Sequence, residues 1–172
     1  TYTFTASEYP WINQEWVSEV IFAAAARVGG GSGLVTLKIV FGLVLFAAAI
    51  AIARRRGAGL SATALTVLLA AVSLSPGWSV RPQIFSYMAF ALLIILLDRD
   101  VLWPIPLLFV AWVNLHAGFV AGLAVLGLYV SCKAVEGFVR RSPSAARDAF
   151  YGAVVVIASG TAILCTPYGL AF

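Results

Sequence analysis

The chain has 172 residues, of which 62% are hydrophobic and only 10% are charged, and its formal net charge is +4. Soluble domains carry about 25% charged residues, and a soluble core of this size cannot bury so many apolar side chains. The composition therefore excludes a soluble domain and predicts an all-α, polytopic integral membrane protein. The basic residues lie in short clusters between apolar runs, as in loops beside a membrane, so the charge does not predict nucleic acid as a partner.

The N-terminal part predicts a helix on the membrane surface. A helical repeat of apolar residues covers about residues 13–28, and it leaves Glu15, Ser18 and Glu19 on the opposite, polar face. An amphipathic helix of this kind lies in the membrane–water interface. We therefore expect residues 1–33 to form an outer-face loop with an interfacial amphipathic helix.

Six apolar runs follow, within a predicted transmembrane helical domain over residues 34–172. A bilayer core is crossed by about 20 helical residues, and shorter runs are tolerated where neighbouring helices cover them or the bilayer thins. Because the sequence begins at Thr1 and stops just after a turn signal, we expect both ends to be truncated. The predicted spans are 34–53, 60–75, 82–97, 101–115, 118–135 and 149–165.

The fourth and fifth spans allow an alternative, in which residues 101–135 form one helix. At about 1.5 Å per residue this helix would be roughly 50 Å long, too long for the bilayer, and it would move Lys133 to the other side. Length and charge therefore favour two helices joined by a tight turn at His116-Ala117-Gly118. Gly118 and Gly122 form a GxxxG pattern, which we interpret as close helix packing inside the bundle.

The basic residues also predict the orientation, because Lys and Arg are enriched in cytoplasmic loops. With the Arg54–Arg56 cluster on one side of the predicted topology, only Arg27, Lys38 and Arg81 fall on the other side. The basic loops are therefore predicted to be cytoplasmic. The residues on that side are Arg54, Arg55, Arg56, Arg99, Lys133, Arg140, Arg141 and Arg147.

Short polar motifs gather on the predicted outer side, and one of them holds His116, the only histidine of the chain. In chain order they read QEWVSE, RPQIFSY, WVNLHAGF and TPYG. This series resembles bacterial polytopic proteins of the GT-C glycosyltransferase superfamily, in particular the glycosyltransferase family 39-like or RgtA/B/C/D-like group. The resemblance covers nearly the whole chain. The sequence departs from the family pattern at Gln14, Ala117 and Thr166, and the acidic residue of the family's first outer loop is expected before Thr1.

The resemblance implies an inverting transfer of a sugar from a polyprenyl-phosphate donor to an acceptor glycan, lipid or protein. It places the protein in the bacterial cytoplasmic (inner) membrane as a multi-pass protein, with the motif-bearing loops on the outer face. No cofactor is implied. One histidine and scattered carboxylates do not make a recognisable metal site, although a divalent metal stays possible.

Such a reaction needs a base for the acceptor hydroxyl, cations or strong donors beside the leaving phosphate, and polar groups for the sugar hydroxyls. The predicted outer side offers candidates for each role. The catalytic candidates are Glu15, Glu19 and His116; the candidates for binding the donor phosphate are Arg81 and His116; the candidates for binding substrate are Gln83, Asn114 and Tyr168.

Structural interpretations of the same residues stay open. The two glutamates suit the wet face of an interfacial helix, Arg81 a snorkelling side chain, and Tyr168 an interfacial aromatic belt. Asn114 and His116 can complete the hydrogen bonding of a tight turn. The alternative functions are a transporter or flippase, which the apolar middles of the predicted helices disfavour, and a catalytically inactive membrane scaffold of the same fold.

Overall fold

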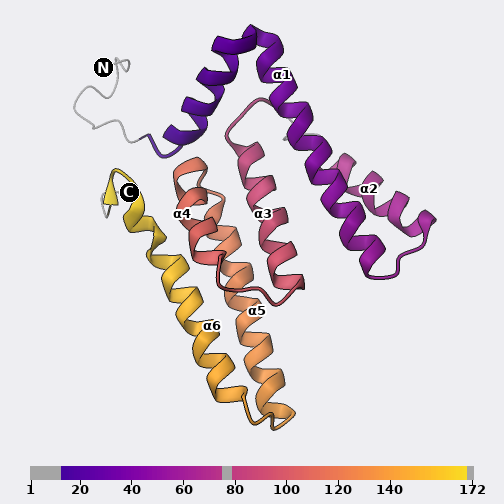
Figure 1. The fold of residues 1–172 in the computed structure, drawn as a ribbon, viewed down its shortest axis with the longest axis vertical. Coiled ribbons are helices and arrows are strands. Elements are labelled where there is room, and N and C mark those ends of the chain that lie inside the picture. Colours follow the sequence, from indigo (N-terminus) through magenta and orange to yellow (C-terminus); the bar gives the residue numbers. More distant parts are fainter. Residues whose placement is uncertain (1–12, 75–78, 170–172) are drawn as a thin grey trace.

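The computed structural model describes residues 13–74 and 79–169, and in these residues the chain is all-helical, as predicted (Figure 1). Residues 1–12 of the predicted outer-face loop and the last residue of the span predicted at 60–75 lie outside the described residues. The described elements are α1 (Trp16–Arg55), α2 (Leu60–Leu74), α3 (Gln83–Asp98), α4 (Ile105–Leu115), α5 (Phe119–Val139), α6 (Ala145–Gly160) and the 3-10 helix η2 (Thr161–Cys165).

Helix α1 combines two predicted elements, the helix over 13–28 and the span over 34–53, and it is sharply kinked between them. Gly30 has φ 56° and ψ −142°, a conformation that side-chain-bearing residues rarely adopt. A Cβ atom on Gly33 would lie 2.2 Å from the Ala25 carbonyl oxygen, so the kink also needs a glycine there. Figure 1 shows α1 rising to an apex and turning back, which divides it into a first arm (residues 16–29) and a second arm (residues 31–55).

The helices alternate in direction, so each end of the bundle collects a different set of residues (Figure 1). The end of α4 and the starts of α3 and α5 meet at one end, which we call the histidine end because it carries His116. The opposite end carries the Arg54–Arg56 cluster and is called the arginine end. There Arg56 pairs with Asp98 and joins the end of α1 to the end of α3.

The core is centred on α4, the shortest α-helix and the most deeply buried. Phe109 and Trp112 of α4 are fully buried against the neighbouring helices. Close packing depends on Gly122 in α5 and on Gly118 at its N-cap, since a Cβ atom on Gly122 would lie 2.4 Å from the Trp112 ring and one on Gly118 would lie 2.3 Å from Ser86 Oγ. The interpretation of the GxxxG pattern as helix packing is therefore confirmed.

Among residues 13–74 and 79–169, three helical segments are long and apolar enough to cross a membrane, namely Trp16–Arg55, Phe119–Val139 and Ala145–Cys165. Helices α2, α3 and α4 are apolar but shorter. The described surface exposes many large apolar side chains along these helices, among them Leu43 at 65% and Leu68 at 60% exposure. An apolar surface this extensive is typical of contact with lipid or with other apolar partners.

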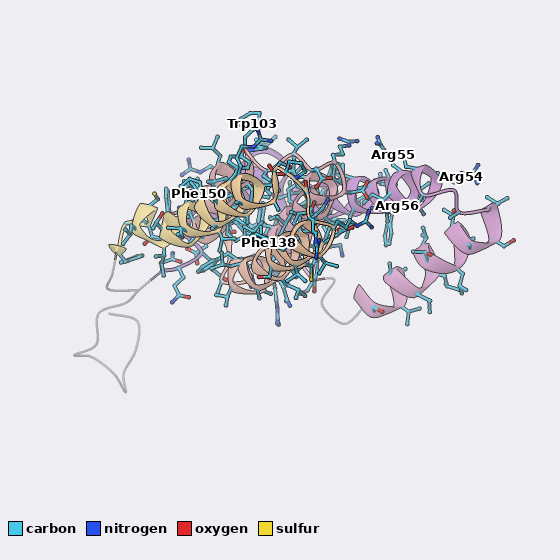
Figure 2. The ribbon with its side chains drawn as sticks, turned by 90° about the horizontal axis from the view of Figure 1, so that it is seen from below. Arg54, Arg55, Arg56, Trp103, Phe138 and Phe150 are labelled. Carbon is cyan, nitrogen blue, oxygen red and sulfur yellow. The ribbon has the colours of Figure 1, made fainter. Side chains whose placement is uncertain are left out.

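Aromatic side chains project from the arginine end. Figure 2 views this end and shows Trp103, Phe138 and Phe150 apart from the arginine cluster at the end of α1. These side chains are 70%, 58% and 72% exposed. An exposed tryptophan at a helix end suits a membrane–water interface.

Several predicted helix bounds need correction. The two helices predicted over 101–115 and 118–135 form and meet at the predicted turn, so the alternative of one helix over 101–135 is wrong, but α4 begins only at Ile105. Pro104 and Pro106 explain this start, because proline is tolerated only in the first turn of a helix. Helix α5 continues to Val139, four residues beyond the predicted span, and the last span is completed by the 3-10 helix η2.

The predicted faces of the first arm were wrong at Ser18. This side chain is fully buried and donates a hydrogen bond to the Leu115 carbonyl oxygen at the end of α4. Val20, predicted to be on the apolar face, is 59% exposed. The first arm thus turns its polar residues toward the histidine end of the bundle.

The α3–α4 turn is held at the arginine end by Asp100, which has a left-handed backbone (φ 53°). The Tyr129 hydroxyl donates to its carboxylate, and Lys133 Nζ lies 2.9 Å from Oδ1. The hydrogen bond from Tyr129, followed by that from Lys133, lowers the pKa of the Asp100 carboxyl below its usual value of 3.8. The carboxylate therefore stays ionised and bound to α5 at neutral pH.

We predict that Gly30→Ala destabilises the fold by about 1–3 kcal/mol, because the alanine side chain strains the kink conformation. Thermal unfolding in detergent, followed by circular dichroism, measures the change. Gly31→Ala is the matched control, since nothing lies within 4 Å of its Cβ position, and it should be neutral or slightly stabilising. Equal effects of the two substitutions would contradict the role of Gly30.

We predict that Asp100 adds a pH-dependent contribution to stability. Because its folded pKa is depressed, the contribution is fully present above pH 3.8 and is lost as the pH falls through the lower folded value. Unfolding midpoints measured across this window should fall more steeply for the wild type than for Asp100→Asn. Glu136→Gln, at an exposed pair with Arg140, serves as the control; an unchanged slope in Asp100→Asn would refute the prediction.

Candidate functional site

The histidine end gathers five of the seven predicted site residues into one hydrogen-bonded cluster. Glu15 and Glu19 come from the start of α1, Asn114 and His116 from the end of α4, and Tyr168 from the segment after η2. We call this set, with Asn13 and the side chains that hold it, the rim cluster. Its members come from three parts of the chain that are far apart in sequence.

His116 is the centre of the rim cluster. Its Nδ1 atom lies 2.9 Å from the Gly118 backbone nitrogen, which donates to it, and 2.7 Å from Ser86 Oγ. Its Nε2 atom lies 3.4 Å from Glu15 Oε1. A backbone N–H only donates, so Nδ1 is an acceptor and the ring proton belongs on Nε2, facing the glutamate.

Glu15 occupies the N-cap position of α1, although its side chain makes no capping hydrogen bond. The backbone N–H of Glu15 donates to Asn13 Oδ1 at 3.2 Å, and its carboxylate turns toward His116. The Glu15 side chain is 35% exposed, so the carboxylate faces both the imidazole and the surroundings. A carboxylate in this position can accept a proton or a substrate hydrogen bond.

Glu19 differs from Glu15 in its partner. Its Oε2 atom accepts a hydrogen bond of 2.6 Å from Asn13 Nδ2, on the exposed side of the arm. The Asn13 backbone N–H also donates to the Tyr168 hydroxyl at 3.0 Å. Asn13 therefore links the two glutamates to the segment after η2, and Glu19 serves to hold this link.

Asn114 uses all of its amide groups within the protein. Its Oδ1 atom accepts the Trp16 indole N–H at 2.8 Å, and its Nδ2 atom donates to the Val110 and Cys165 carbonyl oxygens at 2.9 and 3.2 Å. None of these partners lies in the turn at residues 116–118, so Asn114 has a structural role, but it joins helices and does not complete the turn as predicted. These hydrogen bonds tie α1 and η2 to the end of α4.

Arg81, just before α3, and Gln83, its first residue, lie at the same end of the bundle but outside the hydrogen-bonded cluster. Arg81 is exposed and Gln83 is half-buried. In the described part of the chain, neither side chain bonds to a member of the rim cluster. The structure thus leaves the Arg81 guanidinium available at the rim.

Sequence reasoning missed Ser86, which contacts His116, and Trp112, which contacts Ser86. Trp112 Nε1 donates to Ser86 Oγ at 2.8 Å, and both residues are buried. No spacing in the sequence links Ser86 to a histidine 30 residues later. The only hint was that a serine and a tryptophan stand within the two polar motifs RPQIFSY and WVNLHAGF.

No group of three or more metal-ligating side chains (His, Cys, Asp or Glu) occurs among residues 13–74 and 79–169. Comparison of the chain with protein-family models, with curated proteins and with solved structures finds no match. The chemistry of the rim cluster therefore has to be argued from its own residues.

We predict that Gly118→Ala disrupts the rim cluster, because the new Cβ atom would lie 2.3 Å from Ser86 Oγ and 3.0 Å from His116 Nδ1. Overpacking of this kind costs about 1–3 kcal/mol of unfolding free energy. Thermal unfolding in detergent measures it. Gly127→Ala is the control on the same helix, where nothing lies within 4 Å of the Cβ position. A Gly118→Ala protein as stable as this control would show that the packing is looser than described.

Proposed function

We propose that this protein is a membrane glycosyltransferase of the GT-C type, which transfers a sugar from a polyprenyl-phosphate donor to an acceptor at the outer face of the bacterial cytoplasmic membrane. In this proposal the helices supply about six spans, with α2, α3 and α4 as short spans. The arginine end faces the cytoplasm, and the rim cluster faces outward.

The apolar surface and the charge distribution support this placement. Large apolar side chains cover the helices, whereas the Arg54–Arg56 cluster, Arg140 and Arg141 stand at helix ends that share one side. Basic residues of this density favour the cytoplasmic side of a membrane. The first arm of α1, at the opposite end, then lies near the outer interface.

The observation that carries the proposal is the Glu15–His116 pair, a partly exposed carboxylate held beside an imidazole at the histidine end of the bundle. In the proposed reaction Glu15 takes the proton of an acceptor hydroxyl as its oxygen attacks the anomeric carbon of the donor sugar. The bond from that carbon to the phosphate oxygen breaks, and polyprenyl phosphate leaves. Attack from the face opposite the leaving group inverts the anomeric configuration.

The other residues at this end are assigned to binding the donor phosphate, binding the sugar hydroxyls and holding the site together. Arg81, exposed at the start of α3, is suited to pair with the donor phosphate, where negative charge grows as the bond breaks. Gln83 and Tyr168 are suited to sugar hydroxyls at the edge of the cluster. Asn114 holds the site together, because its amide groups are occupied within the protein.

Glu15 is preferred over Glu19 as the base because the two carboxylates have different partners. Glu15 faces the imidazole, and Glu19 is held by the Asn13 amide on the exposed side of the arm. This difference makes Glu19 a matched control, since it is a carboxylate on the same helix one turn away.

We predict that Glu15→Gln lowers turnover of a polyprenyl-phosphate sugar by about 10²–10⁴-fold, the usual contribution of a general base. Arg81→Ala should lower it by about 10- to 100-fold, as expected for loss of a charged hydrogen bond. Glu19→Gln should remain close to the wild type. The assay measures donor consumption by the protein in membranes, over a panel of donor sugars, with expression checked for each variant.

A catalytically inactive scaffold is the second candidate, and the full use of Asn114 by protein groups favours it. The same assay separates the two functions. If the folded wild type consumes no donor on the panel, or if Glu15→Gln and Glu19→Gln behave alike, the glycosyltransferase proposal fails. The rim cluster is then purely a structural joint between α1 and the bundle.

A further inference from the structure

A chain of polar contacts runs from the core of the bundle to the rim cluster. The Trp112 indole N–H donates to Ser86 Oγ, Ser86 Oγ lies 2.7 Å from His116 Nδ1, and His116 Nε2 faces Glu15. Trp112 is fully buried and Ser86 is 7% exposed. The side chains of His116 and Glu15 are 23% and 35% exposed. Exposure therefore rises along the chain, and the end open to a substrate is the carboxylate.

Trp112 and Gly118 each contribute an N–H group, which can donate a hydrogen bond but cannot accept one. The indole N–H of Trp112 occupies an acceptor site on Ser86 Oγ, which leaves the Ser86 hydroxyl proton for His116 Nδ1. The Gly118 N–H points at the same nitrogen. Two donors on Nδ1 require a bare nitrogen there, so the ring proton is placed on Nε2 toward Glu15.

The direction of the Trp112 indole is itself fixed by packing. The ring centroid of Trp112 lies 5.6 Å from that of Phe90 and 5.5 Å from that of Phe109. Gly122 lies against the same ring, with no room for a side chain. The indole thus has no freedom to turn its N–H away from Ser86.

We propose that Ser86, oriented by Trp112, is a positioning residue that holds His116 in its Nε2–H form, so that the imidazole N–H faces Glu15 and keeps this carboxylate aligned. Although a serine, a histidine and a glutamate stand in line, Ser86 is not a nucleophile, because it is buried between Trp112 and His116. The effect on catalysis rests on the proposed function, but the position of the ring proton does not.

The position of the proton can be measured without any substrate, because His116 is the only histidine of the chain. In protein labelled with ¹⁵N-histidine and held in detergent micelles at neutral pH, the NMR spectrum should show a bare Nδ1 and a protonated Nε2. Ser86→Ala removes one of the two hydrogen bonds that Nδ1 accepts. The Nδ1 resonance should therefore move toward that of an unprotonated nitrogen that accepts fewer hydrogen bonds. Ser86→Cys, which keeps a weak donor of similar size, should give an intermediate shift.

Ser131→Ala is the control, since this serine bonds only within α5, to the Gly127 carbonyl oxygen, and it should leave both resonances unchanged. A proton found on Nδ1 in the wild type would overturn the inference. Unchanged resonances in Ser86→Ala and Ser86→Cys would overturn it equally.

Kinetics then test the consequence in the donor-consumption assay. Ser86→Ala should lower kcat about tenfold with little change in KM, as expected for one hydrogen bond. Adding Ser86→Ala to His116→Ala should cause no further loss, because Ser86 acts through the imidazole. Multiplied losses would show that Ser86 does not act through His116. A wild type without turnover would refute the proposed function and leave the NMR result standing.

Discussion

The docking of the first arm of α1 onto the end of α4 is the contact on which the histidine end depends. Two hydrogen bonds make it, from the Trp16 indole to Asn114 and from the Ser18 hydroxyl to the Leu115 carbonyl oxygen. In an apolar bundle, polar groups this deep have to satisfy one another, since an unpaired one costs about 1–3 kcal/mol. These hydrogen bonds therefore hold the first arm of α1, and Glu15 at its start, beside the α4–α5 turn.

The other side of the contact is rigid because α4 is buried. Trp112, Asn114 and His116 lie within two turns at its end, and each has partners on a different segment of the chain. Gly118, at the N-cap of α5, and Gly122 permit this density, because they let α5 approach α3 and α4 closely. The core thus fixes the geometry of the rim cluster. As a result Glu15, although its side chain is partly exposed, has a defined partner in His116.

Much of this arrangement could be predicted from the sequence. Apolar runs and turn residues predicted the helices, and the length of the bilayer predicted the break at His116. Helix direction then predicted that Glu15, Asn114, His116 and Tyr168 would share one end. The kink at Gly30 also had a signal in the glycine-rich segment at residues 29–33, which lies between the two elements that merged into α1.

The remaining features depend on contacts between distant residues and leave no periodic signal. Ser18 belongs to the polar face of the arm by its spacing, yet it is buried because a carbonyl oxygen 97 residues away accepts its hydrogen bond. Glu15 and Glu19 look equivalent in the sequence, and they differ because Glu15 faces His116 whereas the Asn13 amide binds the Glu19 carboxylate. Ser86 is oriented by the Trp112 indole, which donates a hydrogen bond to it. Hydropathy predicts only that Trp112 belongs to the core and not that it has this partner.

Proximity between the first arm and the α4–α5 turn is the central claim, and cysteine cross-linking tests it most directly. Glu15→Cys and His116→Cys would be combined in a protein whose Cys132 and Cys165 are replaced by serine, then treated in membranes with a short thiol-specific cross-linker. The account predicts rapid cross-linking of this pair and none when Val28→Cys, near the apex of α1 and 92% exposed, replaces Glu15→Cys. Equal cross-linking of the two pairs, or none of the first, would contradict it.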